Sequence, residues 1–186
     1  VYRLQEAVLR YLVEQTFGLP TDLAPDVQAT NQARWNQDIA ANPTLLDFLK
    51  RQMINGEPLN WRIIGRPTYK VLLSYASDEQ LGLDEKGEPL LGARERKHLA
   101  ALLERVNALD PLVELRHRTI IGHDFRGVSE ALILETYKGS RKSDGTRRTP
   151  VEGLAQIMAM LHIDVHANPY DAVVEFVVQQ LCGGQQ

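Results

Sequence analysis

The chain has 186 residues, 44% of them hydrophobic and 24% charged, which is typical of a globular protein of one domain or one domain with a short appendage. The net charge of −3 excludes the global positive field of many nucleic-acid binders, so any RNA contact must come from a local basic patch. The single cysteine, Cys182, excludes a disulfide framework and fits a cytoplasmic protein, and no apolar run approaches the roughly 18 residues that a membrane span needs.

Helical periodicity dominates the chain. Apolar residues recur at intervals of three and four residues in several segments, such as Leu4 to Leu12 and Leu99 to Leu109. A capping residue followed by proline marks helix starts at Asn42-Pro43, Asp110-Pro111, Thr149-Pro150 and Asn168-Pro169. The sequence therefore predicts an all-α fold, with helices at residues 2–16, 28–40, 43–54, 94–109, 111–122, 129–138, 150–166 and 169–182.

Two segments rich in glycine and proline are predicted to be loops, at residues 55–68 and 77–93. Residues 68–75, between them, are ambiguous, because their apolar residues alternate like those of a strand but Leu72 interrupts the alternation. The first loop suggests a boundary between an N-terminal helical segment at residues 1–58 and a main helical domain at residues 59–186.

The segment at residues 115–129 carries the pattern that points to chemistry. It contains Arg118 five residues before His123, and Arg116 seven residues before the same histidine. Seven residues make almost two helical turns, so Arg116 and His123 would share a face, whereas Arg118 could meet His123 only where the helix ends or distorts. Arginine and histidine suit RNA cleavage by the 2′-hydroxyl: the guanidinium offsets the extra charge on phosphorus, and the imidazole transfers a proton or orients the phosphate. This chemistry requires no metal.

The run from Arg116 to Ser129, with its Gly122-His123-x-Phe125-x-Gly127-Val128-Ser129 end, resembles the signature of HEPN domains (higher eukaryotes and prokaryotes nucleotide-binding). It is most similar to the C-terminal HEPN ribonuclease domain of the ancillary effectors of type III CRISPR antiviral systems. The resemblance implies a HEPN-type helical bundle and a metal-independent endoribonuclease that cleaves single-stranded RNA without a cofactor. It further implies a homodimer with a composite site, controlled by cyclic oligoadenylate bound to a CARF domain that we expect outside this chain.

The resemblance implies that His123 is the catalytic histidine, while the arginine stays open between two positions. Arg116 is followed by a polar residue, as the family pattern prefers, and Arg118 has the commoner spacing. His117, Arg126 and Ser129 would contact the RNA or support the site. The alternative for the whole cluster is a solvated helix end.

A basic segment follows the motif. It is rich in glycine, serine and threonine, and its only acidic residue is Asp144. Its basic residues are Lys138, Arg141, Lys142, Arg147 and Arg148. Such a segment could track an RNA backbone, and it could equally be a solvated loop.

Two other functions compete with the ribonuclease. A non-catalytic HEPN module would dimerise or bind nucleotide. A helical metal-binding domain would use His162 and His166, four residues apart, although His162 falls on the apolar face and is better interpreted as a hydrogen-bonded core histidine. Trp35 and Trp61 are predicted to anchor a core or interface.

Overall fold

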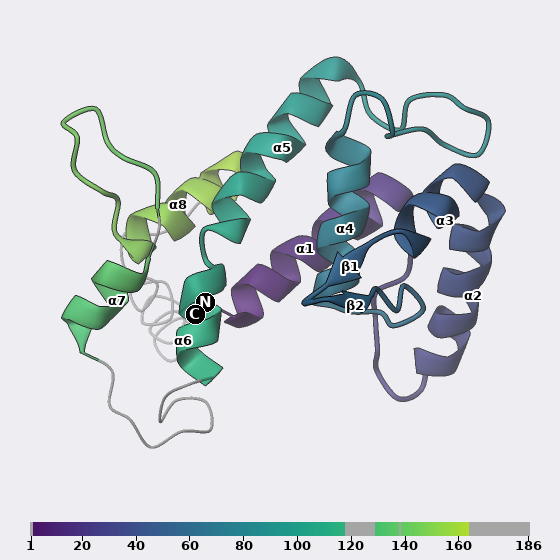
Figure 1. Cartoon of the computed structure of the whole chain (residues 1–186), viewed down its shortest axis with the longest axis horizontal. Coiled ribbons are helices and arrows are strands. Elements are labelled where there is room, and N and C mark those ends of the chain that lie inside the picture. Colours follow the sequence, from purple (N-terminus) through teal and green to yellow (C-terminus); the bar gives the residue numbers. More distant parts are fainter. Residues whose placement is uncertain (1, 118–128, 138, 164–186) are drawn as a thin grey trace, which may run out of the picture. The chain divides into compact units, whose positions relative to one another are not determined.

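The computed structural model describes residues 2–117, 129–137 and 139–163. This part of the chain is mostly helical, as predicted (Figure 1). The chain divides into two compact units, Val1–Gly127 and Val128–Gln186. The boundary expected after residue 58 falls inside the first unit, and a division of the chain at that point stays a prediction. In the described ranges, no helix is both long and apolar enough to cross a membrane.

The first unit consists of helices and one short hairpin. Its elements are α1 (Tyr2–Phe17), α2 (Gln28–Ala41), α3 (Pro43–Lys50), β1 (Met53–Ile54), β2 (Glu57–Pro58), α4 (Arg66–Ser77), α5 (Ala93–Asn107) and α6 (Asp110–His117) (Figure 1). The predicted start of α3 is confirmed, because the Asn42 side chain accepts a hydrogen bond from the Leu45 backbone N–H at 3.0 Å and Pro43 occupies the first turn.

Helix α4 lies in the segment that the sequence left ambiguous, and it is the centre of the first unit. It packs against α1, α3 and α5. Tyr69, Leu72, Leu73 and Tyr75 are almost completely buried, and they lie on more than one side of the helix. A helix that is buried nearly all round shows no apolar stripe, which explains why its period was not recognisable in the sequence.

The helix predicted at residues 43–54 ends earlier, at Lys50. Met53 and Ile54 instead form β1, which pairs antiparallel with β2. Asn55 and Gly56 join the strands with positive φ angles of 53° and 84°, the conformation that an Asn-Gly hairpin turn requires. The prediction was wrong here because the turn residues override the preceding helical pattern.

The two tryptophans lie in the core, as predicted. Trp35 is fully buried, and its indole N–H donates to the backbone oxygen of Trp61 at 3.0 Å. The Trp35 ring meets the Tyr69 ring edge-on, with the centroids 6.1 Å apart. These contacts join α2, α4 and the loop after β2.

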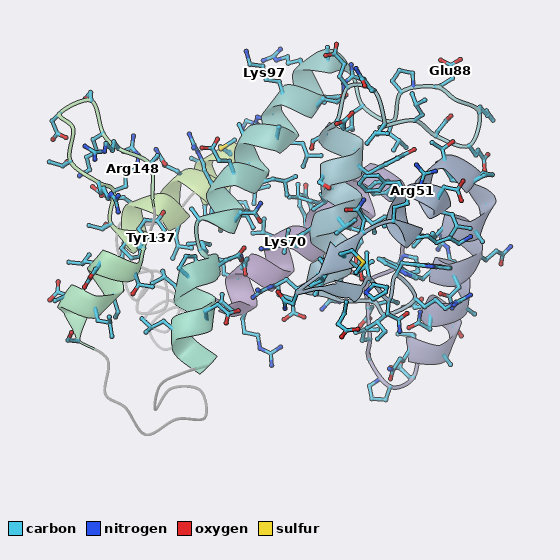
Figure 2. All side chains as sticks on the ribbon, in the orientation of Figure 1. Arg51, Lys70, Glu88, Lys97, Tyr137 and Arg148 are labelled. Atoms are coloured by element: carbon cyan, nitrogen blue, oxygen red, sulfur yellow. The ribbon has the colours of Figure 1, made fainter. Side chains whose placement is uncertain are left out.

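The second unit contains α7 (Glu130–Thr136), a hairpin at residues 140–148 and α8 (Pro150–Met160). The helix start predicted at Thr149-Pro150 is confirmed, and it is a capping box: Thr149 accepts from the Glu152 N–H, and Glu152 accepts from the Thr149 N–H at 2.8 Å. Tyr137, labelled in Figure 2, is buried against two glycines, because a Cβ at Gly139 or at Gly153 would overlap its ring or hydroxyl.

Helix α8 ends at Met160, six residues before the predicted end. The His162 N–H donates to the oxygen of Ala159 at 3.1 Å, and the Ile163 N–H to that of Met158 at 2.9 Å, which is a Schellman ending. His162 has a φ of 56° and is exposed, so the prediction of a core histidine is wrong. The position usually takes glycine or asparagine, so histidine gave no stop signal in the sequence. His166 and the helix predicted at residues 169–182 lie outside the described residues.

Burial of the Tyr69 phenol makes stability depend on alkaline pH. Burial raises the pKa of Tyr69 from 10.0 to about 12. Below pH 10 the phenol is neutral in both states, and its contribution to stability is fully present. As the pH rises from 10 to 12, the unfolded chain releases a proton that the folded chain retains, so about 2–3 kcal/mol of stability is lost. Urea unfolding between pH 10 and 12 should show that the Tyr69→Phe variant loses less free energy of unfolding than the unchanged protein. Equal losses in the two proteins would contradict this assignment.

Substitution of Gly153 by alanine should destabilise the second unit, although alanine normally favours a helix by about 1 kcal/mol. The added methyl group would displace the buried Tyr137, at a cost of about 1–3 kcal/mol. Hydrogen exchange of the α8 amides measures the effect. In a Tyr137→Leu background the same substitution should become neutral or stabilising, and an unchanged penalty there would show that Tyr137 is not the cause.

Candidate nucleic-acid interface

The arginine and histidine motif begins in the last turn of α6. Arg116 and His117 are the final two residues of this helix. Arg118, His123 and Arg126 lie outside the described residues. The described part of α6 thus ends with Arg116 and His117, and the end predicted for this helix at residue 122 lies outside the described residues.

The other end of α6 is tied to the core through Asp110. Its carboxylate accepts hydrogen bonds from Lys70 Nζ at 2.5 Å and from Gln5 Nε2 at 2.8 Å, and the Arg66 guanidinium lies 3.8 Å away. Lys70 is labelled on α4 in Figure 2. An acidic residue at a helix start also interacts favourably with the helix dipole. The cluster therefore holds the first turn of α6 against α1 and α4.

Lys70 is the partly buried cation of this cluster. The Lys70 side chain is 19% exposed, and its desolvation lowers the pKa of the ammonium, while the Asp110 hydrogen bond acts in the opposite direction. Gln5 is fully buried and also donates to the backbone oxygen of Val106 at 2.8 Å, at the end of α5. Gln5 therefore contacts both helices on either side of the α5–α6 junction.

Ser129, expected near the RNA, caps a helix. Its hydroxyl accepts a hydrogen bond from the Leu132 backbone N–H at 3.2 Å and starts α7.

The basic segment after α7 forms a hairpin. The Lys142 N–H donates to the Thr146 oxygen at 2.7 Å, and the Arg148 N–H donates to the Ser140 oxygen at 3.1 Å. Gly145 closes the loop with a φ of 82°, where a side chain would be strained. The Asp144 carboxylate accepts from the side chain and backbone of Thr146, and these hydrogen bonds lower the pKa of Asp144.

One face of the hairpin is occupied by contacts within the unit. Lys142 Nζ lies 2.6 Å from the Glu152 carboxylate, and this contact holds the pKa of Glu152 below its usual value. Arg148 Nε donates to the Ser140 hydroxyl at 3.3 Å. Arg148 is labelled in Figure 2.

Arg141 and Arg147 form the opposite face. They face each other across an antiparallel bridge, and both are exposed. Arg141 Nη1 reaches the Gly145 backbone oxygen at 3.4 Å. Within the described residues no carboxylate forms an ion pair with either arginine. Of the predicted RNA-contacting residues, the structure brings together Arg141, Lys142, Arg147 and Arg148 on one hairpin.

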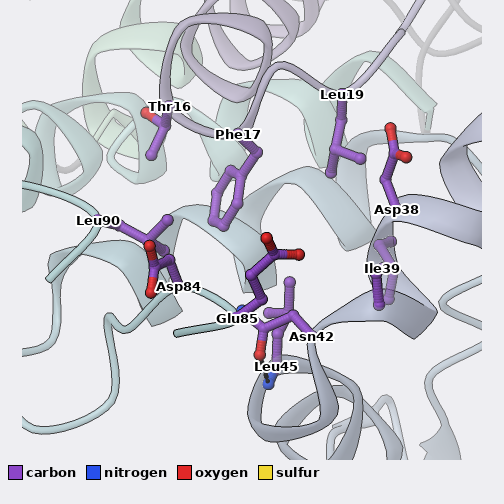
Figure 3. Close-up of a pocket in the computed structure, with 11 residues that line it drawn as sticks. Thr16, Phe17, Leu19, Asp38, Ile39, Asn42, Leu45, Asp84, Glu85 and Leu90 are labelled. Atoms are coloured by element: carbon purple, nitrogen blue, oxygen red, sulfur yellow. Dashed lines mark hydrogen bonds between the residues drawn. The ribbon is translucent and has the colours of Figure 1, made fainter. Parts of the chain in front are cut away.

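A hollow in the first unit is lined by acidic residues, in contrast to the basic hairpin. It has a volume of about 290 Å³ and lies between α1, α2, α3 and the loop after α4 (Figure 3). Its apolar wall includes Phe17 and Leu19, and the carboxylates of Asp38, Asp84 and Glu85 line it. Three carboxylates repel a phosphate backbone, so this hollow does not suit RNA.

The Asp110 cluster was missed in the sequence because Gln5, Lys70 and Asp110 come from distant segments. The hairpin had a local signal, the Asp144-Gly145 pair, which favours a tight turn between two short strands.

Comparisons with models of protein families, with curated proteins and with solved structures find no match for this chain.

Removal of the Asp110 charge should weaken the anchoring of α6. Asp110→Asn leaves Lys70 and Arg66 close together without their carboxylate, and we expect a loss of about 1–3 kcal/mol in the free energy of unfolding. Urea unfolding at pH 7 measures this loss.

Asp38→Asn is the matched control. Asp38 forms an exposed ion pair with Arg34 at 3.3 Å, one helical turn away, and its loss should cost about 0.5 kcal/mol or less. Equal effects at the two positions would mean that the Asp110 cluster contributes no more than a surface pair. The double variant Asp110→Asn with Lys70→Met should recover part of the loss, because the unpaired ammonium is also gone.

Proposed function

We propose that this chain is a metal-independent endoribonuclease of the HEPN type, which cleaves single-stranded RNA as the effector domain of a CRISPR antiviral system. The observation that carries the proposal is the run from Arg116 to Ser129, which begins in the last turn of α6 and ends at the cap of α7. A helix whose first turn is anchored at Asp110 is a suitable support for a guanidinium that must meet a phosphate in one orientation.

The chemistry assigns one task to each group. The 2′-hydroxyl oxygen attacks the neighbouring phosphorus, and the bond from phosphorus to the 5′-oxygen breaks, which leaves a 2′,3′-cyclic phosphate and a free 5′-hydroxyl. His123 accepts the hydroxyl proton or donates one to the departing oxygen. Arg116 or Arg118 offsets the additional negative charge on the phosphorane through paired N–H donors.

The basic hairpin would supply affinity for the substrate. A net charge of −3 provides no general attraction for RNA, so a local cluster of arginine and lysine is needed to hold the backbone. His117 and Arg126, close to the motif in sequence, would contact the RNA or support the catalytic groups. Following the resemblance, two copies would combine their motifs into one composite site, under control of a CARF domain that binds cyclic oligoadenylate.

The test is cleavage of fluorescently labelled single-stranded RNA in excess EDTA. His123→Ala should lower the cleavage rate by about 100-fold or more, because proton transfer by a histidine contributes on that scale. Single substitutions of Arg116 and Arg118 by glutamine then identify the catalytic arginine as the one with the larger effect. Circular dichroism checks that each variant retains its helices.

His162→Asn is the matched control. It removes an exposed histidine from the end of α8, and asparagine tolerates the positive φ of that position. Its cleavage rate should equal that of the unchanged protein. Equal rates for His123→Ala and the unchanged protein would contradict the proposal. Absence of cleavage even when a regulatory domain and its cyclic oligoadenylate are supplied would favour a non-catalytic HEPN module for dimerisation or nucleotide binding.

A further inference from the structure

We propose that Arg141 and Arg147 together form a clamp for one phosphodiester group of single-stranded RNA. The assignment of RNA as the ligand rests on the proposed function. The clamp itself is argued from the geometry and charge of the hairpin at residues 140–148.

Arg141 and Arg147 lie directly opposite each other on the two strands of the hairpin. The hydrogen bonds of their bridge run between the flanking residues, from Lys142 to Thr146 and from Arg148 to Ser140. Arg141 and Arg147 are therefore a non-hydrogen-bonded pair, in which Cα atoms lie about 4.5 Å apart and the side chains project from the same face. Two exposed arginine side chains thus leave the hairpin side by side on one face.

Among the residues that the structure describes, no carboxylate pairs with either of these two arginines. The carboxylates of Asp144, in the hairpin, and of Glu152, which contacts it, have other partners: Asp144 accepts from Thr146, and Glu152 pairs with Lys142 on the other face. Like charges placed directly opposite each other on two strands destabilise a hairpin. An anion between them would remove that repulsion, and a phosphodiester accepts paired hydrogen bonds from guanidinium groups.

The chemistry of the surrounding residues favours the RNA backbone over the bases. Residues 139–149 contain no aromatic side chain on which a base could stack. Arginine contacts to phosphate carry no sequence information. The clamp should therefore hold single-stranded RNA with little preference for base composition.

The experiment is a binding titration of a labelled oligouridylate of about 12 nucleotides, followed by fluorescence anisotropy. The whole 186-residue chain is used with His123→Ala, so that cleavage does not consume the probe. The double variant Arg141→Gln with Arg147→Gln should bind about tenfold more weakly or worse. The slope of log affinity against log salt should fall by about 0.7, the value for one single-strand phosphate.

Single variants test whether the two arginines share one phosphate. If they do, each single substitution should cause most of the loss seen in the double variant, because the remaining arginine cannot hold the phosphate alone. Independent losses that add up, with a slope change near twice the single-phosphate value, would contradict a shared clamp. The substitution of both arginines by lysine keeps the charge and should recover only part of the affinity.

The control removes two positive charges from the first unit in place of the two on the hairpin. Arg94 and Lys97 are exposed on the first turns of α5, and Arg94→Gln with Lys97→Gln should leave RNA affinity unchanged. An equal loss in this control would reduce the effect to net charge and overturn the clamp. The thermal stability of the Arg141 and Arg147 double variant should be equal or higher, because the repulsion between the arginines is gone.

Two further comparisons distinguish the RNA clamp from a free-phosphate site and from the proposed ribonuclease activity. Titration in inorganic phosphate and in chloride at equal ionic strength should give the same RNA affinity, whereas strong displacement by phosphate would identify a free-phosphate site and overturn the RNA assignment. Unaltered binding by the double arginine variant, or no RNA binding by the parent chain, would overturn the clamp even if cleavage is observed. A clamp that binds RNA in a chain that does not cut would leave this inference standing and contradict the proposed ribonuclease.

Discussion

The carboxylate of Asp110 is the point at which α1, α4 and α6 meet. It accepts hydrogen bonds from Gln5 and Lys70 and stands at the first residue of α6. Helix α6 spans eight residues, about 12 Å. A small rotation of the helix axis about Asp110 therefore displaces the far end of the helix. The orientation of α6, and with it the backbone position of Arg116, therefore depends on a contact at the opposite end of the helix.

Local rules explain the parts of the fold that the sequence predicted. The caps at Asn42 and Thr149 act within three residues of the helix that they start, and both are present in the structure. Helix α4 follows no such local rule, because its apolar residues face neighbours on several sides and leave no amphipathic pattern. The ends of α3 and α8 were misplaced for another reason: a hairpin turn and a left-handed residue stop helices whose side-chain pattern would continue.

The candidate site divides in a similar way. The motif around His123 and the basic segment are visible as short patterns, because their residues are neighbours in the chain. The contact of Lys70 with Asp110 joins residues forty positions apart, and neither residue has a local signal for it. The opposition of Arg141 and Arg147 could have been predicted from the Asp144-Gly145 turn, since the turn sets the register of the two strands.

Glu152 performs two structural tasks with one side chain. It accepts the backbone N–H of Thr149 in the capping box of α8, and it pairs with Lys142 of the hairpin. Glutamine is a normal substitute in a capping box but not in an ion pair with lysine. Replacement of Glu152 by glutamine would therefore keep the capping box and lose the ion pair. A lineage that replaced Glu152 could keep its helix and still lose the link between that helix and its arginine-bearing hairpin.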